Sequence, residues 1–103
     1  MSQFDFIPLY DKYPALIAEM KKEFNSHEFI LRLAQQNQKL YVEALYAYRE
    51  SVHRGTPSPF LVVHGILSKQ LHHYPSLITH NGEVDSKDIF GQVNRCASWC
   101  KVK

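Results

Sequence analysis

The most regular hydrophobic pattern in the chain runs from His27 to His53. Apolar side chains recur there with the 3.6-residue period of a helix, and charged or amide side chains fall on the opposite face. Asn25 and Glu28 have the spacing of a capping box, which predicts a helix that begins near Ser26. The predicted stripe, in which Asn37 is the polar member, contains Ile30, Leu33, Ala34, Asn37, Leu40, Tyr41, Ala44, Leu45 and Tyr48.

This pattern is compatible with one helix or with two. No glycine or proline interrupts it before Gly55. A single helix over residues 27–53 would be about 40 Å long at 1.5 Å per residue, which is long for a domain with an expected radius of gyration of about 13 Å. Either Asn37 caps a second helix within this stretch, or one continuous helix protrudes and packs against a partner chain.

Shorter patterns flank this segment. Residues 1–12 are expected to form an extended arm, because Pro8 stands among apolar residues and proline is tolerated only in edge strands. A short helix is expected to follow the arm. Ser58 and Pro59 predict the start of a further helix that ends near His73. The first turns of this helix are apolar on nearly all sides, which indicates a central position.

Residues 77–85 contain Asn81-Gly82 between two short runs of β-compatible residues. This dipeptide predicts a type I′ β-hairpin, because both turn positions need a positive φ. The closing segment, residues 86–99, places apolar side chains at helical spacing and is expected to be a helix. Cys96 and Cys100 fall on one face of that helix, where a disulfide would be strained, so both are expected to be thiols.

These elements predict a single domain over residues 1–103. Its fold class is expected to be mainly α (α+β), with four to five helices and one β-hairpin. The order helix, helix, helix, hairpin is that of a winged helix-turn-helix module, so a winged-helix-like arrangement is the preferred fold. The hairpin at Asn81-Gly82 would then be the wing.

The composition is that of a globular protein, since 45% of the residues are hydrophobic and 21% are charged. The formal net charge of +2 is too small to indicate a polyanionic partner by itself. The longest uncharged, mostly apolar run, Phe60 to Leu67, is too short to cross a bilayer, so no membrane partner is expected. The amino-terminal residues show no secretion signal, which predicts a cytoplasmic protein.

The first functional hypothesis is a non-enzymatic module that binds double-stranded DNA. In a winged-helix-like fold, the polar end of the helix before the hairpin and the basic tail would lie beside the nucleic acid. Cations and hydrogen-bond donors suit phosphates and base edges. The apolar start of the same helix, Phe60 to Val63, weakens this hypothesis, because recognition helices use their N-terminal residues. The candidate contacts are Lys69, Gln70, His72, His73, Arg95 and Lys101.

The second hypothesis is a protein-interaction or self-association module that binds another protein or forms a homodimer. It would use the predicted helix Tyr41–Tyr48 together with the N-terminal arm. Asn37 in the apolar stripe could fix the register of a helical dimer. Apolar side chains opposite the stripe could form a contact patch. The candidate residues are Asn37, Tyr41, Val42 and Tyr46.

No pattern indicates catalysis or a cofactor. No motif pairs a nucleophile with a base, and the four glycines are scattered rather than gathered in a phosphate-binding loop. Cys96 and Cys100 have no second close pair of metal ligands, so no zinc site is expected. His64, at the edge of an apolar stripe, is expected to be a satisfied histidine of the core. The sequence therefore predicts neither an enzyme nor a bound metal.

Overall fold

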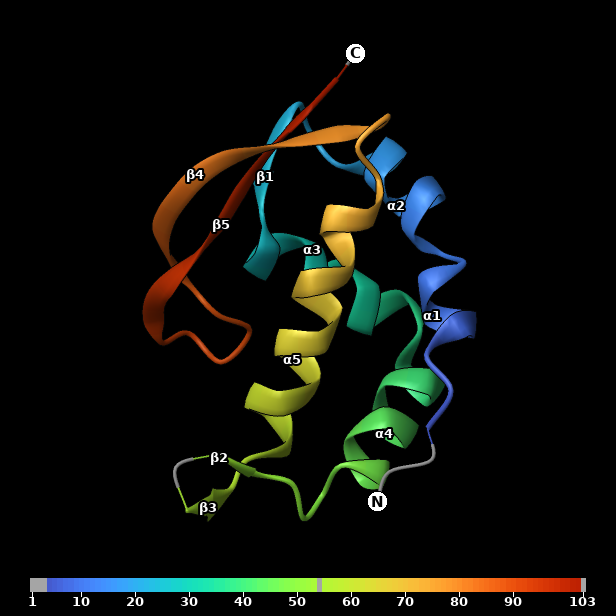
Figure 1. Ribbon diagram of the computed structural model, residues 1–103, viewed down its shortest axis with the longest axis vertical. Helices are drawn as coiled ribbons and strands as arrows, with labels where there is room; N and C mark the ends of the chain where they lie inside the picture. Colours follow the sequence, from blue (N-terminus) through green and yellow to red (C-terminus); the bar gives the residue numbers. More distant parts are fainter. Residues whose placement is uncertain (1–3, 54, 103) are drawn as a thin grey trace.

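A three-stranded antiparallel sheet lies beside the helices (Figure 1). The computed structural model describes residues 4–53 and 55–102. The strand order is β1 (Glu23–Asn25), β5 (Val93–Lys101) and β4 (Ile78–Lys87), so the last strand of the chain is the central one. Only the end of β5 pairs with β1, and the rest of β5 pairs with β4 alone.

Helices make up most of the remainder of the described segments. A short two-stranded ribbon precedes the longest helix, and a turn of 3-10 helix follows it. These elements are α1 (Ile7–Tyr10), α2 (Tyr13–Glu19), α3 (Ser26–Gln36), α4 (Gln38–Ala47), β2 (Val52–His53), β3 (Thr56–Pro57), α5 (Pro59–Gln70) and η1 (Leu71–His73).

The capping box and the helix break are both present. The Asn25 side chain accepts a hydrogen bond from the Glu28 backbone N–H, and the Glu28 carboxylate accepts one from the Asn25 N–H, so α3 begins at Ser26. Asn37 leaves the helical conformation with φ −135° and ψ 53°. Its amide donates to the carbonyl of Leu33 at 3.0 Å, which satisfies a carbonyl near the end of α3. The break into two helices is therefore confirmed, but the Asn37 side chain bonds back to α3 and does not make the expected capping hydrogen bond to α4.

The core forms where the helices meet the inner face of the sheet. Leu9, Tyr13, Phe29, Leu67 and Trp99 are each at most 2% exposed. Two buried hydrogen bonds satisfy the polar atoms of the large side chains. The Tyr13 hydroxyl donates to the carbonyl of Leu67 at 2.6 Å, and the Trp99 indole N–H donates to the hydroxyl of Ser26, which is 1% exposed, at 3.0 Å.

The predicted fold class is wrong. The fold is α+β with a three-stranded antiparallel sheet, and the predicted mainly helical domain with a winged-helix-like order and a hairpin at Asn81-Gly82 is not found. Residues 93–101 form β5 instead of a helix. The physical reason is pairing between distant segments: Trp99 lies opposite Phe24 on one side and His80 on the other. Local helical spacing does not report such pairing.

The hairpin turn lies in a different place from the predicted one. Asn81-Gly82 is inside β4, at an irregularity of the register between His80 and Glu83, and Gly82 has φ 83°. The glycine therefore serves a bulge rather than a turn. The chain reverses at residues 88–92, where the carboxylate of Asp88 accepts from the backbone N–H of Phe90 and of Gln92. This Asx-type bonding holds the loop closed.

Replacing Gly91 by alanine is expected to destabilise the protein by about 1–2 kcal/mol, because Gly91 has φ 83° and a Cβ is unfavourable in that conformation. Gly65→Ala is the matched control. A Cβ at either position meets no atom within 4 Å, but Gly65 lies within α5, where alanine should stabilise by about 0.5–1 kcal/mol. Urea denaturation of both variants measures the difference, and equal effects would contradict the turn assignment.

The amino-terminal segment packs on its own domain. Residues 7–10 form the helical turn α1 where an extended segment was expected, and residues 1–3 of the predicted arm lie outside the described residues. Phe6 and Leu9 are buried in the core, and Ile7 is exposed. Pro8 occupies the first turn of α1, where its missing N–H has no intrahelical partner to lose. The segment therefore covers this core rather than reaching outward.

Candidate interaction groove

A groove of about 460 Å³ lies between the start of α5 and the loop that joins β4 to β5. The end of the hairpin curls back toward α5 in Figure 1, which brings loop 88–92 beside the helix. Pro59 at the first turn of α5 starts the helix at this point. The lining residues are mainly apolar, with a few polar side chains among them: Pro57, Ser58, Pro59, Phe60, Leu61, His64, Asp88, Phe90 and Gln92.

Two phenylalanine rings form a corner of the groove. The Phe60 and Phe90 ring centroids are 4.6 Å apart, and the ring planes are nearly perpendicular at 76°. The His64 ring stacks on Phe90 with the centroids 6.2 Å apart. Phe60 is 41% exposed and Phe90 is 54% exposed, so large aromatic surfaces face solvent here although each ring has a neighbour. Neighbouring Leu61 is 59% exposed.

A hydrogen bond joins His64 to α4. The Tyr41 hydroxyl and the His64 Nε2 atom are 2.6 Å apart. Burial raises the pKa of Tyr41 to about 12, so the phenol keeps its proton at neutral pH. Burial also lowers the pKa of His64, although the Asp88 carboxylate acts in the opposite direction. A neutral imidazole can accept a hydrogen bond from the tyrosine hydroxyl at Nε2 and carry its own proton on Nδ1.

Asp88 provides the negative charge of the groove. Its carboxylate accepts three hydrogen bonds, from the backbone N–H of Gln92 at 3.0 Å, the N–H of Phe90 at 2.9 Å and the side-chain amide of Asn94 at 3.1 Å. The bond from the Gln92 N–H makes the largest contribution to a lowered pKa for this carboxyl. Among the described residues that line the groove, none is a lysine or an arginine.

The lowered pKa of His64 has a consequence for stability. The unfolded chain binds a proton at His64 near pH 6.5, whereas the folded protein binds it only at lower pH, so the free energy of unfolding should fall as the pH drops below about 6.5. The slope from this group reaches at most about 1.4 kcal/mol per pH unit. Urea denaturation between pH 7.5 and 5 should show a flatter profile for His64→Gln than for the wild type. A profile for His64→Gln as steep as that of the wild type would contradict this contribution.

The candidate DNA contacts on β5 have partners within the protein. The Lys101 ammonium group donates to the carbonyls of Ala18 and Met20, at 3.1 and 2.9 Å, and thereby caps the end of α2. Arg95 pairs with Asp85 at 3.6 Å. Arg95 and Lys101 lie on one strand, where a rise of about 3.4 Å per residue separates them by roughly 20 Å. They therefore do not form one cationic patch.

The remaining DNA candidates lie at the end of α5. Lys69 and His73 are exposed, and the Gln70 amide donates to the Tyr74 hydroxyl at 3.1 Å. The His72 ring packs edge-on against Trp99, with a centroid distance of 4.8 Å. The nucleic-acid role of these residues stays a prediction.

The four candidate interaction residues occupy different environments. Asn37 caps α3, and Tyr41 bonds to His64 beside the groove. Val42 and Tyr46 are 59% and 65% exposed on α4. The Arg49 guanidinium lies 4.0 Å from the Tyr46 ring centroid. Only Tyr41 therefore connects directly to a residue of the groove, and an interaction role for the set stays a prediction.

Sequence reasoning missed the groove itself. It placed Phe60 in a central helix and Phe90 on the apolar face of a second helix. The turn built by Asp88 and Gly91 carried a sequence signal, since aspartate favours Asx turns and glycine tolerates positive φ. That signal identifies a loop but does not say that the loop returns to α5.

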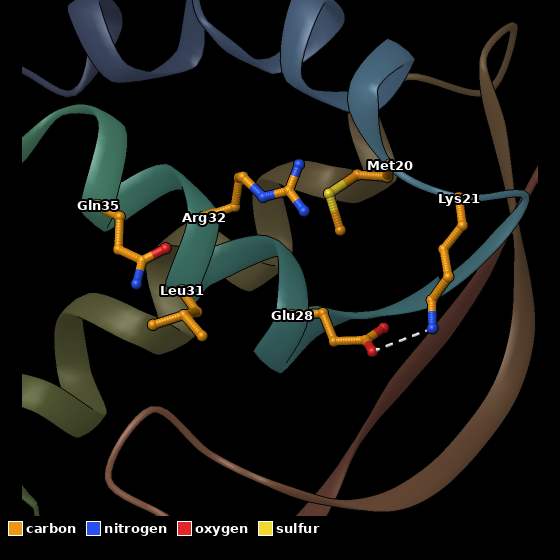
Figure 2. A pocket seen from close by; sticks show the side chains of 6 residues that line it. All are labelled: Met20, Lys21, Glu28, Leu31, Arg32 and Gln35. Carbon is orange, nitrogen blue, oxygen red and sulfur yellow. Dashed lines mark ion pairs between the residues drawn. The ribbon is translucent and has the colours of Figure 1, made fainter.

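A second depression lies on the outer face of α3 (Figure 2). Its volume is about 330 Å³, and each of its three charged lining residues has an ion-pair partner, although the partner of Arg32 lies outside the lining. Lys21 and Glu28 are 3.5 Å apart, and Arg32 lies 3.8 Å from Glu19. Leu31 is the exposed apolar side chain there, at 40%. Solvent-exposed charges that already have ion-pair partners offer little to a ligand, so the groove at α5 is the better candidate site.

Two further findings concern the described residues, and a third concerns comparison with known proteins. Within residues 4–53 and 55–102, no three His, Cys, Asp or Glu side chains are grouped so that they could hold a metal ion. In the same residues, no helix combines the length and the apolar character that a bilayer crossing requires. No protein-family model matches the chain, and no curated protein or solved structure shows significant similarity to it.

Proposed function

We propose that this protein is a non-enzymatic protein-interaction module that binds a partner protein in the groove between α5 and loop 88–92. The observation that carries the proposal is the exposure of three large apolar side chains around one depression. Phe60, Leu61 and Phe90 are 41%, 59% and 54% exposed, and all three line the groove of about 460 Å³. Single exposed apolar residues are ordinary, but a group around a concave site is typical of interaction surfaces.

The groove also has the internal support that a binding site needs. Loop 88–92 is held by the three hydrogen bonds to Asp88. On the helix side, His64 is fixed by its hydrogen bond to Tyr41. Walls that keep their shape before binding reduce the entropy that association costs.

DNA binding has less support than protein binding. The hypothesis depended on a hairpin at Asn81-Gly82 beside the end of α5, and that hairpin is not found. The two cationic candidates on β5, Arg95 and Lys101, already interact with other groups of the protein. The free thiols of Cys96 and Cys100 are compatible with action in a reducing compartment, so we place the module in the cytoplasm as part of the proposal.

Selection from a random peptide library displayed on phage tests this function. The wild-type protein is the bait, and Phe60→Ala/Phe90→Ala is used for counter-selection. We expect enriched peptides whose affinity falls at least about tenfold on the double variant. Ile7→Ser is the matched control, because Ile7 is also exposed at 56% but lies on α1 outside the groove. Failure to enrich any peptide, or equal binding to the double variant, would overturn the proposal.

A further inference from the structure

We propose that the groove recognises a basic side chain, a lysine or an arginine, of the partner protein. The aliphatic stem of that residue would pack in the corner between Phe60 and Phe90. Its charged end would bind the carboxylate of Asp88. This inference rests on the proposed function and names the chemistry of the partner's anchor residue.

The aromatic corner suits a long cationic side chain. The two ring planes meet at 76° with their centroids 4.6 Å apart, so a ligand can touch the exposed surface of both rings at once. Lysine and arginine bury their methylene stems along apolar surfaces and keep the charge in contact with polar groups. A cation within about 6 Å of an aromatic centroid is also attracted by the ring quadrupole. The corner therefore attracts both parts of such a side chain.

Asp88 retains capacity for one further hydrogen bond. Its Oδ1 atom accepts from the N–H groups of Phe90 and Gln92, which accounts for both lone pairs of that oxygen. Its Oδ2 atom accepts from Asn94 alone, which leaves one acceptor position. An ammonium or guanidinium N–H suits this position, because hydrogen bonds between ionised groups are about twice as strong as neutral ones.

Among the described residues that line the groove, no lysine or arginine competes for that charge, although the imidazoles of His64 and His27 interact electrostatically with Asp88. The described lining residues contain one carboxylate and no lysine or arginine. Lys87 is next to Asp88 in the chain but is exposed and does not line the groove. Arg95 is the nearest arginine in sequence, and it pairs with Asp85. The negative charge of Asp88 thus favours a basic anchor side chain over a purely apolar one. An apolar anchor bound in the groove would cover the Asp88 carboxylate without supplying a positive charge.

Titration of ¹⁵N-labelled protein with four short peptides tests the inference. The peptides acetyl-Ser-Gly-X-Gly-Ser-amide carry lysine, arginine, norleucine or glutamate at X. Norleucine is the matched control because it has the same stem length as lysine without the ammonium group. We expect saturable amide shifts in residues 57–64 and 88–92, with lysine and arginine bound about tenfold more tightly than norleucine, the ratio of one charge-assisted hydrogen bond. Glutamate should bind least.

Two variants separate the charge from the shape of the loop. Asp88→Asn should reduce the lysine affinity to that of norleucine. The double variant Asp88→Asn/Asn94→Asp keeps a hydrogen bond between these two side chains, with the amide now at residue 88 and the carboxylate at residue 94. The loop should therefore be retained, while the charge moves to residue 94, which does not line the groove. Loss of lysine preference in both variants supports the inference.

The outcomes also separate the two proposals. Norleucine binding as tightly as lysine, with both weakened by Phe90→Ala, would overturn the basic anchor and leave the interaction groove standing. Lysine preference that persists in both Asp88 variants would likewise overturn the role of this carboxylate. Absence of shifts in residues 57–64 and 88–92 with all four peptides would overturn the basic anchor, and the phage selection then decides on the groove.

Discussion

Replacing Trp99 by alanine is expected to lower the free energy of unfolding by about 3–5 kcal/mol, the range for loss of a large buried aromatic side chain. Trp99 is 2% exposed and occupies the middle of the three-stranded sheet, opposite Phe24 and His80. Its indole N–H also donates to Ser26 at the start of α3. The substitution therefore removes buried apolar surface and leaves a buried hydroxyl without its donor.

Equilibrium urea denaturation measures this effect, and Val93→Ala is the control. Val93 lies on the same strand but is 66% exposed, so its substitution should change stability by no more than about 0.5 kcal/mol. Trp99→Phe keeps an aromatic ring and loses the hydrogen bond, so a cost of about 1–3 kcal/mol is expected even if the alanine variant does not fold. Similar losses for Trp99→Ala and Val93→Ala would contradict the burial pattern of β5.

The carboxyl-terminal segment shows why local patterns mispredicted part of the fold. Cys96 and Cys100 are four residues apart, which suits one face of a helix, but on β5 they also share a face because the strand period is two. Both periods fit the same two positions. Pairing with β1 and β4, which are distant in sequence, determines that this segment is a strand and not a helix. Such pairing carries no local signal.

The helical part was more predictable, because its signals are local. Asn25 and Glu28 satisfy each other's backbone donors within a single turn, so their spacing alone located the start of α3. Asn37 bonds to the carbonyl of Leu33, also within one turn, which explains why a polar residue in an apolar stripe indicated the break. Interactions of short range can be inferred from short sequence windows.

The candidate groove required three-dimensional information. Phe60 and Phe90 stand thirty positions apart, and each has the character of a core residue in its own segment. Their contact arises because the long hairpin bends back toward α5. His64 was predicted to be a satisfied histidine of the core. It is satisfied by its hydrogen bond to Tyr41, but it is half-buried and lines an exposed groove instead of belonging to the core.

Replacing Phe29 by alanine should cost about 3–5 kcal/mol of folding free energy. Phe29 is fully buried, and its ring centroid lies 4.8 Å from that of Tyr13 and 6.0 Å from that of Phe24. The side chain thus connects α3 to α2 and to β1. The substitution would leave a cavity bordered by α2, α3 and β1. These elements are packed against one another and cannot each move inward to fill it, so most of the contact energy of the ring should be lost.

Thermal unfolding followed by circular dichroism at 222 nm is a second measure of this loss. For a domain of this size, each kcal/mol lowers the melting temperature by about 4–8 °C, so a decrease of at least about 12 °C is expected. Leu31→Ala on the same helix is the matched control, because Leu31 is 40% exposed and should lose no more than about 1 kcal/mol. If the two variants melted together, the orientation of α3 would be wrong. The placement of α5, which carries one wall of the groove, would then be wrong as well, because α3 packs on α5.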